Sequence, residues 1–180
     1  MAPCFAVARM ADGSSTGASC SRERTRKGEL DHIAVEVRFH QQAEDSLFRF
    51  AVTVAVYAGR IVFCRHESHA GYELPGGRRE PGEDIRRTAE RELWEESGAT
   101  EFTMQPVAAY SVRNGEVETY GMLYYAEITR FGVLPPFEIT TVELFPPTAL
   151  PMEYTYPLIQ PLLVEKVLQW RQAKADGCGC

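Results

Sequence analysis

Several short segments of the chain alternate apolar and polar residues, or run continuously apolar, in the way that strands do. These segments are residues 33–39, two stretches within residues 50–66, and residues 102–112, 117–128 and 140–145. Ala58-Gly59 separates the two stretches within 50–66, and Asn114-Gly115 separates the two longest ones. Both dipeptides are typical of tight turns, so the pattern predicts a β-sheet with two hairpins.

Helical spacing of apolar residues appears twice. In residues 84–97 an apolar stripe at i, i+4 and i+8 would pack on a sheet; it consists of Ile85, Ala89 and Leu93. Asp84 is placed to cap the start of this helix and Gly98 to end it. Residues 158–173 read as a closing helix whose apolar positions are Leu162, Leu163, Val167 and Trp170. Strands and helices together predict an α/β (α+β) domain.

The length of 180 residues, with 44% hydrophobic and 24% charged residues, predicts one domain with tails. Residues 1–28 are small and polar, then basic, without periodicity, and we expect them to be disordered or loosely ordered. The domain is expected at residues 29–174, and residues 175–180 are expected to be a flexible C-terminal tail.

The location of the protein is predicted to be cytoplasmic. No stretch approaches the roughly 18 apolar residues that span a bilayer, and no contact with a membrane is expected. The opening residues lack the cationic start of a signal peptide. The five cysteines are odd in number and lie mainly near the chain ends, which indicates reduced thiols rather than a disulfide scaffold.

The formal net charge of −6, from 19 basic and 25 acidic residues, argues against a protein held to nucleic acid by general charge. A basic cluster does occur near the N-terminus, at Arg22, Arg24, Arg26 and Lys27. Short charge runs at chain ends are usually solvated. We therefore expect no stable nucleic-acid complex, and any polyanion that the protein handles has to be bound locally.

Glu92, Glu95 and Glu96 lie at i, i+3 and i+4, so they share one face of the predicted helix within an arc of about 100°. Like charges at this spacing cost about 0.2 to 0.5 kcal/mol per pair. The helix dipole disfavours each anion in the last turns by a further few tenths to about 1 kcal/mol. A solvated acidic face is one interpretation. A divalent cation that compensates the charges is the other, and hard Mg²⁺ or Mn²⁺ prefers oxygen ligands.

The residues before this helix favour the metal. Leu74-Pro75-Gly76-Gly77 predicts a tight turn whose glycines allow the backbone to approach an ion or a phosphate closely. A turn of this kind beside an acidic face is suited to a site where Mg²⁺ is shared between carboxylates and substrate phosphates.

Residues 77–99 resemble the Nudix box, Gly-x5-Glu-x7-Arg-Glu-U-x-Glu-Glu-x-Gly-U, in which U is a bulky apolar residue. The matching positions are Gly77, Glu83, Arg91, Glu92, Leu93, Glu95, Glu96 and Gly98. Ala99 departs from the pattern by being smaller than usual, which affects packing behind the helix. The fixed residues at fixed offsets should match by chance far less often than about one window in a million.

Resemblance to the Nudix hydrolase family implies an α/β/α sandwich, with a mixed β-sheet between helices and the box as a loop-helix-loop. The order of strands and helices from about residue 31 to residue 173 is similar, which is roughly four fifths of the chain. The segment GYELPGG, the strand MLYYAEI and the end of the chain look most like the MutT-like nucleoside triphosphate pyrophosphohydrolases.

The resemblance also implies roles for individual residues. Glu92, Glu95 and Glu96, with the Gly76 carbonyl, would hold one or more Mg²⁺ ions, with Mn²⁺ as a substitute, and the metal would activate water to attack phosphorus. The proton of that water would go to Glu92 or to a glutamate outside the box. Glu138 is the candidate for that outside glutamate.

Three further residues are implied to support the metal ligands. Glu83 and Arg91 are expected to form an ion pair that fixes the loop to the helix, and Gly77 belongs to the same support. None of them would contact phosphorus. Glu143 is the alternative to Glu138 as the outside glutamate.

Candidates for substrate contact outside the box are Arg78, Arg65 and Tyr72. The arginines could bind phosphates and the tyrosine could stack on a base or sugar, whereas a solvated cation and a core aromatic are the alternatives. Arg79 likewise could bind a phosphate or be a solvated cation, and Tyr120 could stack on a base or sugar or be a core aromatic.

His66 and His69, at i and i+3 in a loop, predict no zinc site but leave a substrate contact open. Cys64 lies in an apolar run and is interpreted as a buried small residue, and Cys178 and Cys180 as part of a free tail.

The function predicted by this resemblance is hydrolysis of a (d)NTP or oxidised dGTP to the monophosphate and pyrophosphate. RNA 5′ pyrophosphate removal and cleavage of ADP-ribose or another nucleotide sugar are alternatives at the same site. A non-catalytic nucleotide sensor is an alternative from a different class, and an isomerase on the same fold is a further one. The resemblance leaves a homodimer open.

Overall fold

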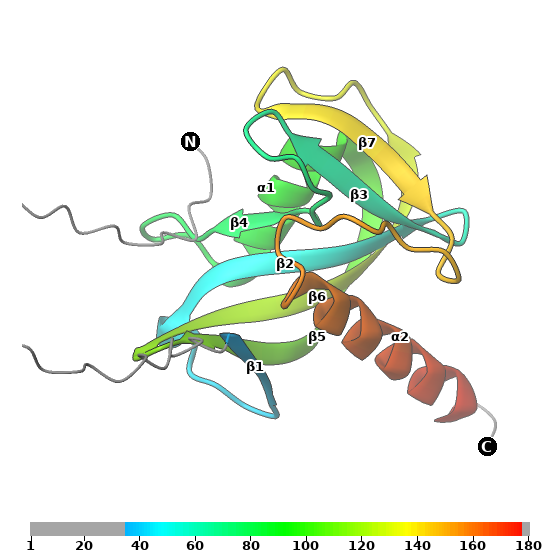
Figure 1. Cartoon of the computed structure of the whole chain (residues 1–180). Helices are drawn as coiled ribbons and strands as arrows, with labels where there is room; N and C mark the ends of the chain where they lie inside the picture. The colour runs from blue at the N-terminus through cyan, green and yellow to red at the C-terminus, as the bar shows by residue number, and fades with distance from the viewer. Residues whose placement is uncertain (1–34, 178–180) are drawn as a thin grey trace, which may run out of the picture.

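The structure, a computed structural model, describes residues 35–177. Their centre is a seven-stranded mixed sheet (Figure 1). The expectations for the first 28 residues and for Cys178 and Cys180 lie outside this part. The strand order is β1-β5-β6-β2-β3-β7, with β4 paired to β2. The strands are β1 (Val35–His40), β2 (Phe48–Tyr57), β3 (Arg60–His66), β4 (Gly76–Arg78), β5 (Ala99–Asn114), β6 (Val117–Phe131) and β7 (Ile139–Phe145). The helices are α1 (Ile85–Ser97), α2 (Gln160–Gly177) and a short 3-10 turn at Asp45–Leu47.

Both predicted hairpins are present. β2 and β3 are joined at Ala58 and Gly59, whose φ angles of 49° and 77° give the left-handed turn that suits a two-residue hairpin loop. β5 and β6 are joined at Asn114 and Gly115, and Gly115 also has a positive φ of 62°. β5 and β6 are longer than predicted because their pairing extends to Ala99 and Phe131, beyond the segments with a clear strand pattern.

The helix α1 begins and ends where the sequence predicts. The Asp84 side chain accepts a hydrogen bond from the amide of Arg86, and Gly98 ends the helix in the left-handed conformation at φ 73°. Ala89 and Leu93 are fully buried against β2 and its neighbours on one face of the sheet. The predicted apolar stripe therefore attaches the acidic helix to the sheet.

The helix α2 covers the opposite face, which completes an α/β/α arrangement (Figure 1). Leu163 and Val167 are buried there, whereas Leu162, predicted to be part of the apolar face, is 41% exposed. The helix runs through residues 175–177, which were expected to belong to a flexible tail. Within residues 35–177 no helix combines the length and apolar character needed to cross a membrane.

The prediction of a tight turn at residues 74–77 is wrong. β2 and β3 pair with each other only near their shared turn, and the segment leading into β4 lies between them further along. Glu73 exchanges two backbone hydrogen bonds of 2.9 Å with Cys64 of β3, and the Pro75 carbonyl accepts from Thr53 of β2 at 2.8 Å. The segment is thus an inserted strand, and it brings the first glycines of the box to the middle of the sheet.

Gly76 allows this insertion because it has no side chain. A Cβ at Gly76 would lie 2.5 Å from the carbonyl oxygen of Ala51 and 2.8 Å from the Cα of Val52. No larger residue fits at that distance from a neighbouring backbone. The glycine is used for close approach between strands and not for a turn.

Candidate active site

A cleft of about 1330 Å³ opens beside α1. Acidic residues of the box line it together with an acid and a histidine from elsewhere in the chain. Its charged and aromatic lining includes Glu83, Glu92, Glu95, Glu96, Glu138, His66, Arg78, Arg79, Arg91 and Phe137. The fold therefore gathers at one place the three box glutamates and Glu138, which the sequence proposed separately.

The carboxylate of Glu92 lies directly on Gly77. A Cβ on Gly77 would be 2.2 Å from Oε1 and 2.4 Å from the carboxyl carbon of Glu92. Gly77 is thus required for the position of Glu92, which is 9% exposed. Burial raises the pKa of Glu92, and the charge and hydrogen bond of Arg91 oppose that shift.

Glu96 is as buried as Glu92. Its Oε2 accepts a hydrogen bond of 2.9 Å from the amide of Gly76, and the thiol of Cys64 donates to the same oxygen at 3.7 Å. Burial, followed by the nearby charges of Glu92 and Glu73, holds the pKa of Glu96 well above its usual range, although the Gly76 amide works in the other direction.

Cys64 is buried, as the sequence predicts, and burial raises the pKa of its thiol. Its contact with Glu96 was not anticipated, because a thiol in an apolar run gives no sign of a polar partner 32 residues away. The contact arises because β3 passes behind the end of α1.

Arg91 connects the acids of the box. It forms two hydrogen bonds with Glu83, of 2.9 and 3.0 Å, so the predicted ion pair between loop and helix is present. Its Nη1 also donates to Glu92 at 2.7 Å and to Glu95 at 3.0 Å. The hydrogen bonds from Arg91 lower the pKa of Glu83 to about 2, and the acids around Arg91 raise its pKa in turn.

The donors present fit a hard divalent cation. Within residues 35–177 no group of three or more His, Cys, Asp or Glu side chains is arranged to hold a metal ion. However, the Arg91 guanidinium lies between Glu92 and Glu95 as a cation would, and both of these residues offer the oxygen ligands that a hard cation prefers. The amide of Gly76 faces α1, and because both backbone groups of a strand residue point to the same edge, its carbonyl faces α1 as well.

Glu138 lies at the cleft directly before β7. Its Oε2 is 2.7 Å from Nε2 of His66, and this hydrogen bond lowers the pKa of Glu138. The alternative acid, Glu143, lies within β7 opposite Phe63 and interacts with the hydroxyl of Tyr72, outside the cleft lining. The structure therefore favours Glu138 over Glu143 as the acid that faces the box.

The predicted substrate contacts separate into two groups. Arg78 is exposed at the cleft, and within residues 35–177 its side chain makes no hydrogen bond or ion pair. Arg65 and Tyr72 do not line the cleft: the guanidinium of Arg65 lies 3.9 Å above the Tyr72 ring, and Tyr72 is 9% exposed in the core on the α2 side. Tyr72 is therefore a core aromatic, the alternative weighed above.

The two remaining candidates are also engaged elsewhere. Arg79 lines the cleft but donates to the Asp45 carboxylate at 2.8 Å and to the Glu83 carbonyl, so it fixes the loop. Tyr120 packs near His40, with ring centres 5.4 Å apart, away from the cleft lining.

Phe137 lines the cleft and was not a candidate from the sequence. It is 56% exposed, packs edge-on to Trp94, and carries no sequence signal beyond its position next to Glu138.

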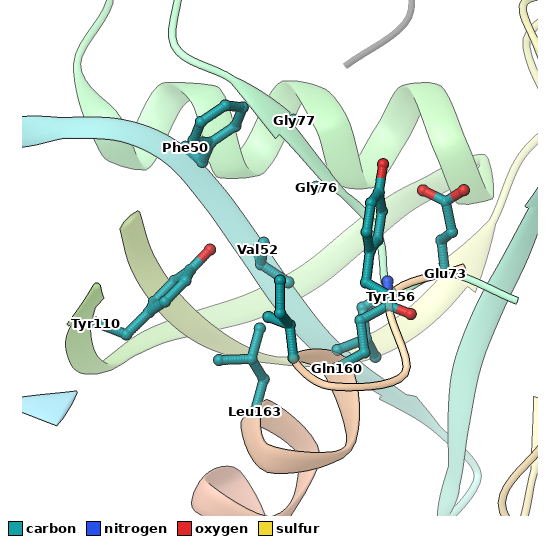
Figure 2. Close-up of a pocket in the computed structure, with 11 residues that line it drawn as sticks. Phe50, Val52, Glu73, Gly76, Gly77, Tyr110, Tyr156, Gln160 and Leu163 are labelled. Carbon is teal, nitrogen blue, oxygen red and sulfur yellow. The ribbon is translucent and has the colours of Figure 1, made fainter. Parts of the chain in front are cut away.

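A second, smaller cavity lies between β4 and the start of α2 (Figure 2). Glu73, Tyr156, Phe50 and Gln160 are among the residues that line it. Its volume of about 30 Å³ has room for one water molecule, so it is too small for a nucleotide base. The large cleft beside α1, of about 1330 Å³, has room for a nucleotide.

Solved structures with a similar fold carry several different activities in their names. The pyrophosphohydrolase BsRppH of Bacillus subtilis has a TM-score of 0.63 and 24% identity, over 75% of this chain and 90% of that one. A UDP-X diphosphatase has a TM-score of 0.60 and 17% identity, over 74% and 66%. The NUDIX domain of Shewanella oneidensis NrtR, complexed with ADP ribose, has a TM-score of 0.55 and 13% identity, over 68% and 86%. These likenesses show the fold alone.

In sequence, the chain is 29% identical over 96 residues to the Bacillus subtilis (strain 168) protein named "Putative 8-oxo-dGTP diphosphatase YtkD". The match covers 53% of this chain and 60% of that protein, so it spans about three fifths of the relative. The family model for the NUDIX domain matches residues 47–165, which include the box, the sheet from β2 to β7 and the first turns of α2. This match, over residues 47–165, shows that the chain belongs to the NUDIX family.

Proposed function

We propose that this protein is a Mg²⁺-dependent pyrophosphohydrolase that cleaves a nucleoside triphosphate, with oxidised dGTP as the first candidate, to the monophosphate and pyrophosphate. One observation carries the proposal. Glu92, Glu95 and Glu96 line the same cleft as Glu138 and as the exposed Arg78. The cleft thus offers carboxylates for metal, an acid outside the box and a cation for phosphate.

Each residue has a part in this reaction that its surroundings support. Glu92, Glu95, Glu96 and the Gly76 carbonyl would hold Mg²⁺, which when bound lowers the pKa of water and neutralises charge on the phosphate oxygens. Arg78 would bind a phosphate oxygen at the exposed side of the cleft.

Glu138 would accept the proton of the attacking water. The carboxylates of Glu92 and Glu96 are the proposed metal ligands, whereas Glu138 lines the same cleft from outside the box and is held there by His66. Its carboxylate is ionised near neutral pH, as a proton acceptor has to be, and the His66 hydrogen bond favours this charged form. Glu83, Arg91 and Gly77 would support the ligands, since Arg91 links Glu83 to Glu92 and the Glu92 carboxylate lies on Gly77.

Oxidised dGTP is the first candidate because of the relative named for 8-oxo-dGTP diphosphatase activity. RNA 5′ pyrophosphate removal and cleavage of nucleotide sugars use the same chemistry and remain the competing substrates. A sensor without catalysis would not require the full set of box glutamates, which this chain retains.

The test is a substrate panel with Mg²⁺ and with Mn²⁺: the four dNTPs, 8-oxo-dGTP, ADP-ribose, UDP-sugars, dinucleoside polyphosphates and triphosphorylated RNA. We expect release of pyrophosphate from a triphosphate, and in ¹⁸O-labelled water the label will show which phosphorus is attacked. Glu96→Gln should abolish the activity. Glu90→Gln, on the same helix but paired with Arg86 and Arg87 outside the cleft, is the matched control and should retain it. Absence of turnover with every substrate would overturn the proposal in favour of a sensor.

A further inference from the structure

His66 and Glu138 form a pair across two neighbouring strands. His66 is the last residue of β3, and Glu138 directly precedes β7, which pairs with β3. The register between the strands shifts between Arg65 and His66, an irregularity of the kind that redirects a side chain. The amide of Glu67 donates to the Glu138 carbonyl at 2.9 Å, so the backbone directly after His66 is tied to Glu138.

Ser68 determines which ring nitrogen of His66 carries the proton. The backbone amide of Ser68 lies 3.1 Å from Nδ1, and its hydroxyl lies 2.7 Å from the same atom. A backbone amide can only donate, so Nδ1 has to accept. The ring proton is therefore on Nε2, which lies 2.7 Å from Glu138 Oε2 and donates to it.

The pair is enclosed on the histidine side and open on the glutamate side. His66 is 5% exposed, whereas the side chain of Glu138 is 34% exposed, and both line the cleft that holds the box glutamates. An enclosed ring with a fixed proton cannot turn away from its partner without losing the hydrogen bonds from Ser68. One oxygen of Glu138 is thus held in a single direction while the carboxylate remains accessible from the cleft.

We propose that His66 is a positioning residue for catalysis, which orients Glu138 as the general base through a tautomer set by Ser68. The proposal rests on the proposed function. In the step it supports, the water oxygen forms a bond to phosphorus and its proton passes to Glu138. The bond from phosphorus to the bridging oxygen breaks, and the leaving group takes the electron pair: pyrophosphate if the α-phosphorus is attacked, the nucleoside monophosphate if the β-phosphorus is. His66 keeps its Nε2 proton throughout and touches neither water nor substrate.

A double-mutant cycle with His66→Phe and Glu138→Gln tests this assignment. His66→Phe retains a ring for packing but removes the donor, and we expect kcat to fall about tenfold or more while KM changes less than about twofold. In the Glu138→Gln background the same change should have no further effect on kcat. His40→Phe is the matched control, since His40 contacts Ser111 on β5 outside the cleft, and it should leave kcat unchanged.

The pH profile supplies a readout that a purely structural role would not move. Loss of the His66 donor should raise the apparent pKa on the acidic limb of the kcat–pH profile, because the hydrogen bond from His66 favours the charged form of Glu138. The other charged groups around this cleft are unchanged in the variant. They are Glu92, Glu95, Glu96 and Arg91 on α1, Arg78, Arg79, Glu80, Glu83 and Asp84 before it, Arg49 on β2, and Glu67 and His69 beside His66. His66→Gln, which can donate from its amide, should recover part of kcat.

Two results would overturn the assignment in an active enzyme. One is an equal loss from His66→Phe with and without Glu138, which would mean that the histidine acts independently. The other needs no variant: nitrogen-15 NMR of the wild-type imidazole should show the proton on Nε2, and a proton on Nδ1 would contradict the proposed geometry. A wild-type protein without any turnover would instead overturn the proposed function, so the two failures are distinguishable.

Discussion

Gly77→Ala should displace the carboxylate of Glu92 and leave the stability of the fold nearly unchanged. Gly77 does not have a positive φ, so alanine adds no backbone strain there. Its Cβ would lie 2.2 Å from Glu92 Oε1, and the carboxylate has to move by about 1.2 Å to reach the 3.4 Å of an ordinary contact. A displacement of about 1 Å in a catalytic group costs on the order of 100-fold in rate. We therefore expect kcat/KM to fall by about that factor, or about 2.7 kcal/mol.

The free energy of unfolding should change much less than the activation free energy, because the group that the new Cβ displaces, the Glu92 carboxylate, is the end of a rotatable side chain. An off-rotamer Glu92 costs about 1 kcal/mol. Gly59→Ala is the matched control: Gly59 has φ 77° and no atom within 4 Å of an added Cβ, so its strain also costs about 1 kcal/mol but leaves the cleft intact. Gly76→Ala meets the backbone of Ala51 at 2.5 Å and should destabilise the protein by about 3 kcal/mol.

The assay is Mg²⁺-dependent release of pyrophosphate, with the free energy of unfolding measured by urea titration on the same samples. Gly77→Ala and Gly59→Ala should have similar stability, and only the former should lose activity and require more Mg²⁺. Full activity and an unchanged Mg²⁺ requirement in Gly77→Ala would refute the reasoning, since Glu92 would then have moved without consequence for the metal.

Three further predictions concern the charges and the core. Burial raises the pKa of Glu96, so its ionisation destabilises the metal-free fold as the pH rises above the usual value of 4.5. Glu96→Gln should raise Tm in EDTA at pH 8, with a gain that fades toward pH 4.5 in calorimetry. Glu83, whose pKa is lowered to about 2, stabilises the fold above pH 4.5 and loses that effect between 4.5 and 2. Glu83→Gln should cost about 2 kcal/mol at pH 7 in urea titrations, and the difference from wild type should shrink over that acidic range. Leu163→Ala, in the core under α2, should cost about 3 to 5 kcal/mol and leave KM unchanged at 25 °C.

Features that depend on neighbours in the chain were predictable. The start and end of α1 follow from Asp84 and Gly98, because a cap and a left-handed glycine act on the adjacent backbone. The shared face of Glu92, Glu95 and Glu96 follows from the helical repeat. The ion pair of Glu83 with Arg91 was reached through the resemblance to the Nudix box, and its two hydrogen bonds are present.

Features that depend on distant strands were mispredicted or missed. Two glycines after a proline read locally as a turn, but the space between β2 and β3 makes them an inserted strand. Tyr72 carries the same local signal whether it faces a substrate or a core, and only the position of α2 and β7 determines that it is buried.

The sequence by itself determined the family-defining box, the start and end of its helix and the acidic face of that helix, because each depends on spacings of a few residues. Only the tertiary structure decided what surrounds those acids. The contacts of Glu96 with Cys64, of Glu92 with Gly77 and of Glu138 with His66 join residues 32, 15 and 72 positions apart. Such contacts depend on strand order and register, for which no short sequence pattern exists. They determine the pKa shifts and the orientations of the side chains on which catalysis would depend.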